Sequence, residues 1–373
     1  MPGLTLDELA ALRTLLSVDR IGPQKARSII SRFQSFDFIH RVSHQELMQT
    51  EGVSDELAKR IIKASRQYDE FLESTKTLLA SLEKSNAQVI TLWDEKYPHR
   101  LKNIYDPPLI LYYKGILTPE PENAIAIVGT REPTQYGRSA AERFAADLSK
   151  VGFTIVSGLA RGIDSHAHRS VIKSGGRTIG VLGCGIDVVY PYENKPLYAE
   201  MEKQGAIITE YPPGTKPDAV NFPKRNRIIS GLSLGTLIVE TGVTGGALHT
   251  ANFALDQGRE VFAVPGNIGI RQSEGPNMLI QKGEAKLVRN ADDIITEFSS
   301  VINSQSKPKT QAPPPDLTLF EAVILNNLSS EPVHVDKLSE LTSLSVSDCL
   351  VNLLTLEFKG LVRQLPGKNF ILS

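Results

Sequence analysis

The chain has 373 residues, of which 41% are hydrophobic and 22% are charged, and its formal net charge at pH 7 is −1. A chain of this length can bury a sizeable core, and we expect two or three domains. The near-zero net charge argues against a non-specific binder of duplex nucleic acid, which usually has a basic excess, so any nucleic-acid site must be a local patch.

The cysteines and the N-terminal residues indicate the cellular compartment of the protein. The only two cysteines, Cys184 and Cys349, lie far apart without metal-ligand spacing, which predicts no metal site and a reducing compartment. The sequence shows no basic leader followed by an apolar segment, and no apolar run reaches the ~18 residues of a membrane helix. We therefore expect a cytoplasmic protein without a membrane segment.

Residues 1–80 read as short helices that contain an internal repeat. The segment RIGPQKARSII at 20–30 recurs as GVSDELAKRII at 52–62, and the pair resembles a tandem helix-hairpin-helix (SAM-like) unit. Turn amides in such hairpins can meet a phosphate, but Asp55 and Glu56 in the second copy would repel one. We therefore favour a scaffold or protein-contact role for this domain, with direct DNA contact as the alternative. The first copy also departs from the pattern, because Arg20 stands where Gly52 stands in the second.

Residues 85–298 alternate short apolar runs with helical stretches punctuated by glycine. The runs are continuously apolar, which is typical of strands buried on both faces of a mostly parallel sheet with covering helices. This pattern predicts an extended Rossmann-like α/β domain. A further strand is expected within residues 108–115. The other predicted strands are Ala124–Val128, Thr154–Ser157, Thr178–Leu182, Ala206–Thr209, Thr236–Glu240, Val261–Val264 and Lys286–Val288.

The last part of the chain predicts a linker and a small domain. Residues 299–316 are rich in Pro and Ser without periodicity, as in a linker. Three helical segments and a hairpin within 317–373 predict a winged helix. From Asp316 onward there are seven acidic and four basic residues, and the expected recognition helix, 345–359, carries Asp348 and Glu357 against Lys359. Binding of duplex DNA depends on cations that neutralise its phosphates, so we expect this domain to contact another protein rather than a duplex. Transcription regulation is a weaker alternative.

Ligands of open α/β sheets bind beyond the carboxyl ends of the strands, so we consider the residues after each predicted strand together. Glycines there let backbone N–H groups approach a phosphate, and arginines add full charges. Turn chemistry alone would explain about half of the glycines. The residues that we select for single-stranded DNA from these turns are Arg131, Ser157, Gly158, Arg161, Gly245 and Gly246.

The segment NFPKRNRIISGLS at 221–233 is the strongest single indication of a ligand. An aromatic face accepts a base while guanidinium and ammonium groups hold phosphates, so Phe222 with Lys224, Arg225 and Asn226 suits an unpaired strand. The alternative is a turn followed by a solvated basic cluster. Arg227, which adjoins an apolar run, is interpreted as a structural cation and a partner for Glu240.

Enzymatic interpretations have weaker support. No GxGxxG or Walker A sequence is intact, so no cofactor is predicted. His166 and His168 would point to different faces of a helix, Asp164 reads as an N-cap, and Cys184 has no identifiable base. The alternative function from another class is a Rossmann-type nucleotide-processing enzyme that uses Glu240 with Arg161. We find no convincing catalytic set.

Taken together, these motifs resemble the DprA family, also called Smf, of bacterial DNA-processing proteins. They run in the family's order across roughly 120–285. The segments that carry the resemblance are IVGTR (127–131), IVSGLARGID (155–164), VLGCGID (181–187), YP (190–191), FPKRNRIISGLS (222–233) and VPG (264–266).

The resemblance implies an extended Rossmann domain that binds single-stranded DNA without cutting it during natural transformation and recombination. It also implies loading of the recombinase RecA, displacement of single-strand-binding protein and a homodimer. By motif, Arg131 would hold a phosphate and Phe222 would stack on a base, and Lys224, Arg225 and Asn226 would line the same groove. Members often have Ser at the positions of Thr130 and Gly245 and an aliphatic residue at that of His249, which puts a side-chain hydrogen bond at Gly245 in doubt.

Overall fold

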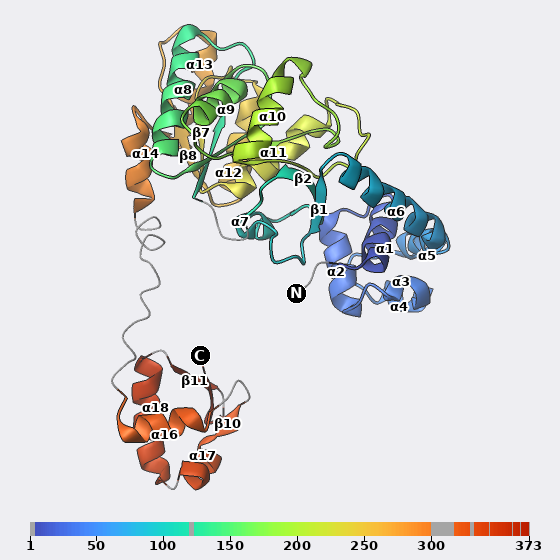
Figure 1. The fold of residues 1–373 in the computed structure, drawn as a ribbon, viewed down its shortest axis with the longest axis vertical. Helices are drawn as coiled ribbons and strands as arrows, with labels where there is room; N and C mark the ends of the chain where they lie inside the picture. The colour runs from blue at the N-terminus through green and yellow to red at the C-terminus, as the bar shows by residue number, and fades with distance from the viewer. Residues whose placement is uncertain are drawn as a thin grey trace. The chain divides into compact units, whose positions relative to one another are not determined.

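The computed structural model describes residues 4–118, 123–299, 317–328, 332–342, 344–359, 361–365 and 367–372. The chain divides into two compact units, Met1–Ser299 and Ser300–Ser373 (Figure 1). The predicted linker lies outside the described residues except for Ser299, and the predicted borders of the four segments stay predictions. Within the described ranges, no helix has both the length and the hydropathy needed to cross a bilayer.

The N-terminal helices contain the predicted tandem hairpin. They are α1 (Leu6–Leu16), α2 (Pro23–Phe33), α3 (Phe38–Arg41), α4 (His44–Met48), α5 (Asp55–Ser65) and α6 (Tyr68–Lys84). The two copies of the repeat begin α2 and α5, with Gly22 and Ser54 as N-caps. In the turns before them, Gly52 has a φ of 78° and Arg20, its equivalent, has a φ of 68°. This left-handed backbone disfavours a side chain with a Cβ, so Arg20 carries a cost that Gly52 avoids.

The helical region packs onto the edge of the central sheet. Leu12, Ile29 and Ile61 are fully buried in a hydrophobic core that continues into the sheet. The rings of Phe36 and Trp93 meet edge to face with centroids 5.1 Å apart. Residues 1–299 therefore form one compact unit rather than two separate ones.

A nine-stranded sheet forms the centre of this unit, in the order β1-β2-β6-β5-β4-β3-β7-β8-β9. The pairs β1–β2 and β2–β6 are antiparallel and the others are parallel, which confirms the predicted mostly parallel sheet. The sequence did not predict β1, in which Gln88 is exposed and only two residues are buried. The strands are β1 (Gln88–Thr91), β2 (Ile110–Gly115), β3 (Ala124–Val128), β4 (Thr154–Ser157), β5 (Thr178–Val181), β6 (Ala206–Thr209), β7 (Gly235–Ile238), β8 (Glu260–Ala263) and β9 (Lys286–Leu287).

Helices cover the sheet, and the order of the strands reverses between β3 and β7. Helix α8 packs on α9 and α9 on α10, while α11 packs on α12. From β3 the chain proceeds outward to β4, β5 and β6, and then returns across the sheet to β7, which lies beside β3. This is the topological switch point at which such sheets bind ligands. The helical elements here are α7 (His99–Lys102), α8 (Gln135–Lys150), α9 (Ile163–Lys173), the 3₁₀ helix η1 (Tyr192–Asn194), α10 (Lys195–Gln204), α11 (Asn221–Leu232), α12 (Gly246–Asp256), α13 (Arg271–Gln281) and α14 (Ala291–Glu297).

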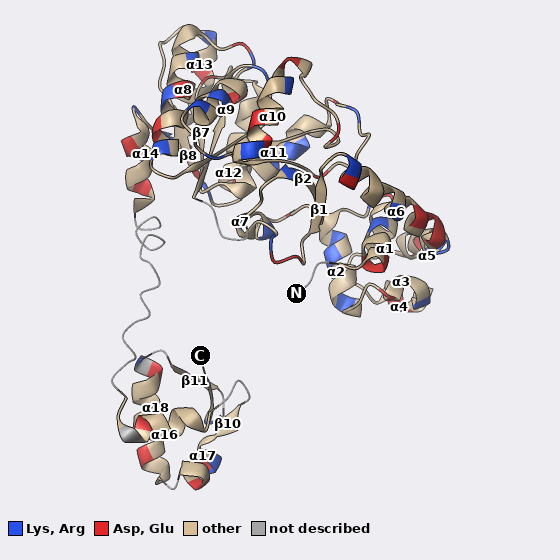
Figure 2. Ribbon diagram, in the orientation of Figure 1, with Lys and Arg blue, Asp and Glu red and all other residues tan. Residues whose placement is uncertain are grey.

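The second unit is the predicted winged helix. Its elements are α16 (Leu319–Asn326), β10 (Val333–His334), α17 (Val335–Thr342), α18 (Val346–Phe358), β11 (Val362–Leu365) and β12 (Asn369–Leu372). The strands form an antiparallel sheet in the order β10-β12-β11. Ile324, Leu338 and Leu353 are fully buried at its core. Figure 2 shows acidic residues on its helices, in line with the excess of acidic over basic residues in this part of the sequence.

Candidate nucleic-acid interface

A cleft of about 730 Å³ opens at the switch point between β3 and β7. This volume falls within the usual size of ligand sites. The loops that follow the two strands contribute Arg131 and Thr241, α11 contributes Phe222, α12 contributes Gly246, and α13 contributes Arg271. Segments that are more than 100 residues apart in the sequence therefore meet at one edge of the sheet.

Phe222 is the aromatic centre of this cleft. Helix α11 begins at Asn221, so the ring stands in its first turn and is half-buried. The ring lies over Gly183, where a Cβ would come within 2.9 Å of the Phe222 Cδ1 atom. Tyr190 lies beside it, with ring centroids 5.5 Å apart. One edge of the cleft is therefore a surface on which a base can stack.

Arg131 lies above the ring of Phe222, with its Cζ atom 5.7 Å from the centroid. Its loop is held firmly, because the Thr130 N–H donates to the Glu240 carbonyl (2.7 Å). Gly129 allows this packing, since a Cβ there would lie 2.5 Å from the Ile163 Cγ1 atom. The Arg131 side chain is exposed and has no hydrogen-bond or ion-pair partner among the described residues. It is free to meet a phosphate.

Arg225 is buried, with 4% of its surface exposed, although the sequence places it in the same basic cluster. Its guanidinium donates to the Val181 carbonyl, and its Cζ atom lies 5.9 Å from the centroid of the Phe222 ring. Burial lowers the pKa of Arg225 and raises that of Asp164, while the attraction between the two charges opposes both shifts. Gly158 leaves the space that the guanidinium occupies, because a Cβ there would lie 2.2 Å from Arg225 Nη1. Arg225 thus supports Phe222 from beneath.

The turn after β4 is built by internal hydrogen bonds. The Ser157 hydroxyl is buried and donates to the Ile127 carbonyl (2.6 Å), so this side chain is already engaged. The prediction that Asp164 is an N-cap is wrong, because Gly162 caps α9. The Asp164 carboxylate instead accepts from the Gly158 N–H at 3.1 Å and lies beneath the turn.

Gly245 and Gly246 begin α12 at the opposite wall of the cleft. Gly245 is the N-cap, and no side chain caps the helix. The Asn226 side chain reaches across from α11 to the Gly246 carbonyl (3.4 Å). A Cβ at Gly245 would lie 2.0 Å from Thr241 Oγ1, so the Thr241 hydroxyl takes the space that a serine side chain would need. The backbone start of α12 is left to act on an anion.

Arg161 and Lys224 lie outside the main cleft. Arg161 lines a smaller pocket that adjoins the cleft at Arg131, Tyr190 and Phe222. Its guanidinium forms two 2.8 Å hydrogen bonds with the Glu193 carboxylate, and both groups are exposed. Lys224 is exposed on α11 and does not line the cleft.

The carboxylate proposed for catalysis has a structural partner. Glu240 is 1% exposed and accepts from the Thr134 N–H (2.9 Å) and hydroxyl (2.5 Å) at the start of α8. The prediction that Arg227 pairs with Glu240 is wrong. Arg227 instead donates to Glu210 (2.6 and 2.7 Å) and lies 3.4 Å from the Asp106 carboxylate.

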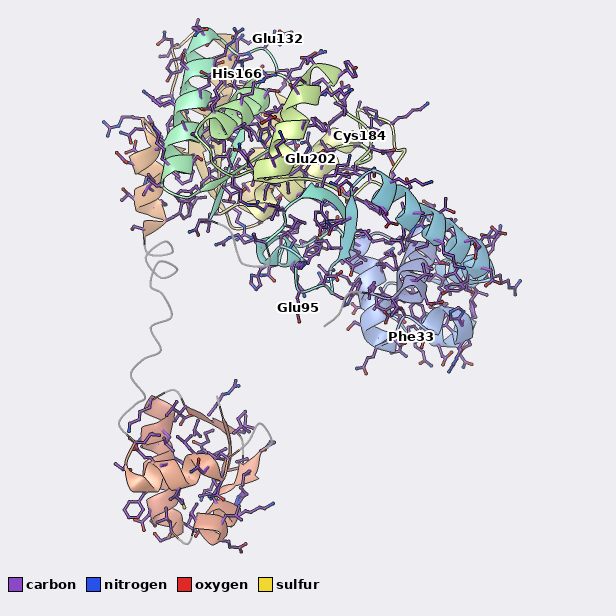
Figure 3. All side chains as sticks on the ribbon, in the orientation of Figure 1. Phe33, Glu95, Glu132, His166, Cys184 and Glu202 are labelled. Carbon is purple, nitrogen blue, oxygen red and sulfur yellow. The ribbon has the colours of Figure 1, made fainter. Side chains whose placement is uncertain are left out.

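The remaining titratable candidates are also engaged. His166, which is labelled in Figure 3, lies against Glu142 of α8, with 2.8 Å between Nδ1 and Oε1. His168 is fully buried against Thr178. Burial raises the pKa of Cys184 to about 11, so its thiol stays protonated. No group of three or more His, Cys, Asp or Glu in the described part of the chain is arranged to hold a metal.

Among the residues of the cleft that were not selected from the sequence are Tyr190, Thr244, His249 and Arg271. Arg271 begins α13 after a loop that follows β8, so the strand-end rule would have found it had that longer loop been included. Like Arg131, it is exposed and has no ion-pair or hydrogen-bond partner for its side chain among the described residues.

Models of known protein families match the N-terminal, central and C-terminal regions of the chain. The family model "DNA recombination-mediator protein A" matches residues 88–299, "SAM-like Helix-hairpin-helix tandem" matches 12–67, and "DprA winged helix domain" matches 308–368. Protein Smf of Synechocystis is 32% identical over 95% of this chain and 96% of its own.

Two solved structures are similar to this one. DNA processing protein A of Streptococcus pneumoniae matches with a TM-score of 0.66 and 32% identity over 79% of this chain and 98% of its own. The corresponding protein of Helicobacter pylori, whose structure concerns its single-stranded DNA binding mode, matches with a TM-score of 0.52 and 30% identity over 57% and 97%. The motifs, the fold and these matches confirm the resemblance: the chain belongs to the DprA/Smf family of DNA-processing proteins.

Proposed function

We propose that this protein binds single-stranded DNA in the cleft between β3 and β7, by holding phosphates and stacking a base, without cutting the strand. The observation that carries the proposal is that Arg131, which has no hydrogen-bond or ion-pair partner among the described residues, lies 5.7 Å from the centroid of the Phe222 ring. A ring beside a free guanidinium suits an unpaired base and its phosphate better than it suits a duplex, whose bases are covered. Family membership supports the same function.

Each wall of the cleft has a part in this proposal. Arg131 and Arg271 bind phosphates, and the uncapped start of α12 at Gly245 and Gly246 supplies backbone donors. Phe222 stacks on a base while Arg225 holds it in place from below. Of the residues selected from the sequence, Arg131, Phe222, Gly245 and Gly246 have this direct role, whereas Ser157, Gly158 and Arg225 shape the site. Asn226 ties α11 to α12, and Lys224 and Arg161 act outside the main cleft.

The alternative of a nucleotide-processing enzyme is less well supported. Glu240, its base candidate, is buried and accepts two hydrogen bonds from Thr134, so it serves the start of α8. The two functions differ in a simple assay. A strand binder retains oligo(dT) intact with an affinity that falls with salt, whereas the enzyme would turn over a mononucleotide.

We further propose, from the family resemblance, that the protein acts in the cytoplasm as a homodimer, hands the strand to RecA and displaces single-strand-binding protein. The winged helix fits a protein partner better than a duplex. Lys359 of the expected recognition helix is engaged with Glu321 at 2.7 Å, while Val351 and Leu354 on α18 are more than half exposed. RecA ATP hydrolysis on DNA coated with single-strand-binding protein tests the hand-over, and light scattering tests the dimer.

The decisive experiment compares single-stranded and duplex oligonucleotides by fluorescence anisotropy, using wild type and Phe222→Ala. We expect a preference for the single strand and a loss of about tenfold or more on removal of the ring, because one stacked base contributes about 1–3 kcal/mol. Equal affinity of the two proteins for the single strand would overturn the proposed site.

A further inference from the structure

A second aromatic and basic surface begins where the main cleft ends. The smaller pocket shares Arg131, Tyr190 and Phe222 with the cleft and continues to Arg161. Two positions after Tyr190 in the sequence stands Tyr192, with 73% of its surface exposed, whereas Tyr190 is 41% exposed. Tyrosine is enriched at binding surfaces, because its ring can stack on a partner while its hydroxyl stays in water.

Basic side chains lie close to the aromatic rings of this surface. Lys195 Nζ lies 5.8 Å from the centroid of the Tyr192 ring, in the same kind of arrangement as Arg131 over Phe222. Arg161, which lines the smaller pocket with Tyr190 and Phe222, is bound to Glu193, the residue that follows Tyr192. Aromatic rings accompanied by cations are the combination that binds single-stranded nucleic acid.

The segment that bears Tyr192 is held rigidly. The buried Asn194 donates to the Leu159 carbonyl and to the Ser165 hydroxyl, both at 2.9 Å, and accepts from Arg169 at 3.0 Å. These bonds fasten η1 to the turn after β4 and to α9. A ring that is exposed on a fixed backbone loses little conformational entropy when a ligand stacks on it.

We propose that the single-strand site does not end at Phe222 and that Tyr192 stacks on a base farther along the same strand. Tyr190 joins the two positions, and Arg161 and Lys195 neutralise the phosphates between them. The proposal rests on the proposed function and adds to it a second stacking position. It also explains why a 3₁₀ turn with no part in the cleft presents an exposed ring beside a lysine.

Glu193 is the one carboxylate in this segment, and its ion pair with Arg161 is exposed on both sides. Exposed ion pairs contribute little to stability, so a phosphate can replace the carboxylate as the partner of Arg161. The substitution Glu193→Gln removes the negative charge and releases Arg161. It should therefore raise the affinity for a strand that is long enough to reach this segment.

The test measures anisotropy of labelled oligo(dT) over lengths from about 3 to about 12 nucleotides, which spans short and extended sites. Tyr192→Ala should leave the affinity for the shortest strands unchanged and weaken binding of the longer ones about tenfold, the loss of one stacked base. Tyr192→Trp should retain the affinity. Tyr105→Ala removes a ring that is 78% exposed but, unlike Tyr192, has no cation over it among the described residues and does not adjoin a residue that lines either pocket. It should have no effect at any length.

The outcomes separate this proposal from the proposed function. If Tyr192→Ala binds every length like wild type while Phe222→Ala is weakened, the strand does not reach Tyr192 and the inference is overturned, whereas the cleft stands. If Phe222→Ala also binds like wild type, both fail. An equal loss for Tyr192→Ala at all lengths would likewise contradict a separate distal position.

Discussion

Replacing Arg131 tests the contacts between the cleft and the phosphates of the strand more directly than any other substitution. Arg131 and Arg271 are the exposed arginines that line the cleft, and neither has an ion-pair partner for its side chain among the described residues. Each phosphate contact on a single strand contributes about 0.7 to the negative slope of log affinity against log salt. Two such contacts give a slope of about −1.4 from the cleft, and Arg131→Ala should reduce it by about 0.7.

The expected effect is large enough to measure. Between about 50 and about 200 mM salt, two contacts weaken binding about sevenfold and one contact about 2.6-fold. Affinity at low salt should also fall about tenfold or more, because a hydrogen bond to a charged group contributes about 1.5–3 kcal/mol. Arg131→Lys retains the charge but not the two-pronged geometry, so it should preserve the slope and lose part of the affinity.

The assay is anisotropy of labelled oligo(dT) in a salt series. Arg138→Ala is the matched control, because Arg138 is exposed on the neighbouring helix α8 and does not line the cleft. It should retain both slope and affinity. If Arg131→Ala keeps the full slope, Arg131 makes no phosphate contact and the assignment of the cleft is refuted.

Three further expectations concern stability and the support of the site. Arg20→Gly should raise the free energy of unfolding by about 0.5–1 kcal/mol, because glycine adopts the left-handed backbone at φ 68° without the strain that a Cβ causes, although it also increases the entropy of the unfolded chain. A urea midpoint no higher than that of wild type would contradict this prediction. Burial lowers the pKa of His168 to about 3, so the stability that this group contributes is complete above its unfolded pKa of about 6.5 and declines by about 1.4 kcal/mol per pH unit as pH falls toward 3. His168→Asn should therefore reduce the change of the urea midpoint between pH 7 and pH 5. The same pH dependence in the variant as in wild type would contradict this role of His168. Gly183→Ala should push the Phe222 ring aside and weaken oligo(dT) binding while the circular dichroism spectrum is retained, and full affinity would show that the ring position does not matter.

Much of the fold could be predicted because its signals are local. Buried parallel strands are continuous apolar runs, and β3, β4 and β6 occupy the predicted residues. The helical repeat likewise places the starts of α2 and α5. The exception is β1, an edge strand that pairs with β2 alone. Its four residues change from exposed to buried along the strand and include the polar Gln88 and Thr91, so it has no continuous apolar run to detect.

The roles of the cations could not be predicted, because burial and pairing are not local properties. Arg131 and Arg225 are the same residue type in the same set of motifs, yet the first is exposed and the second lies beneath a ring. Arg227 pairs with Glu210, whereas Glu240 accepts from Thr134 at the start of α8. Each of these outcomes depends on which backbone groups the tertiary fold brings within reach.

The sequence by itself determined the classes of structure present, since hydrophobic period, turn residues and the repeat depend on a few neighbouring positions. It also identified the family, because the motifs retain their order and residue types. Only the tertiary structure decided which of the selected residues meet in one cleft and which lie outside it. The return of the chain from β6 to β7 places the ends of β3 and β7 side by side, and the loops after β5 and β8 bring Tyr190 and Arg271 to the cleft. Which residues meet there depends on strand order, a long-range property that no local segment contains.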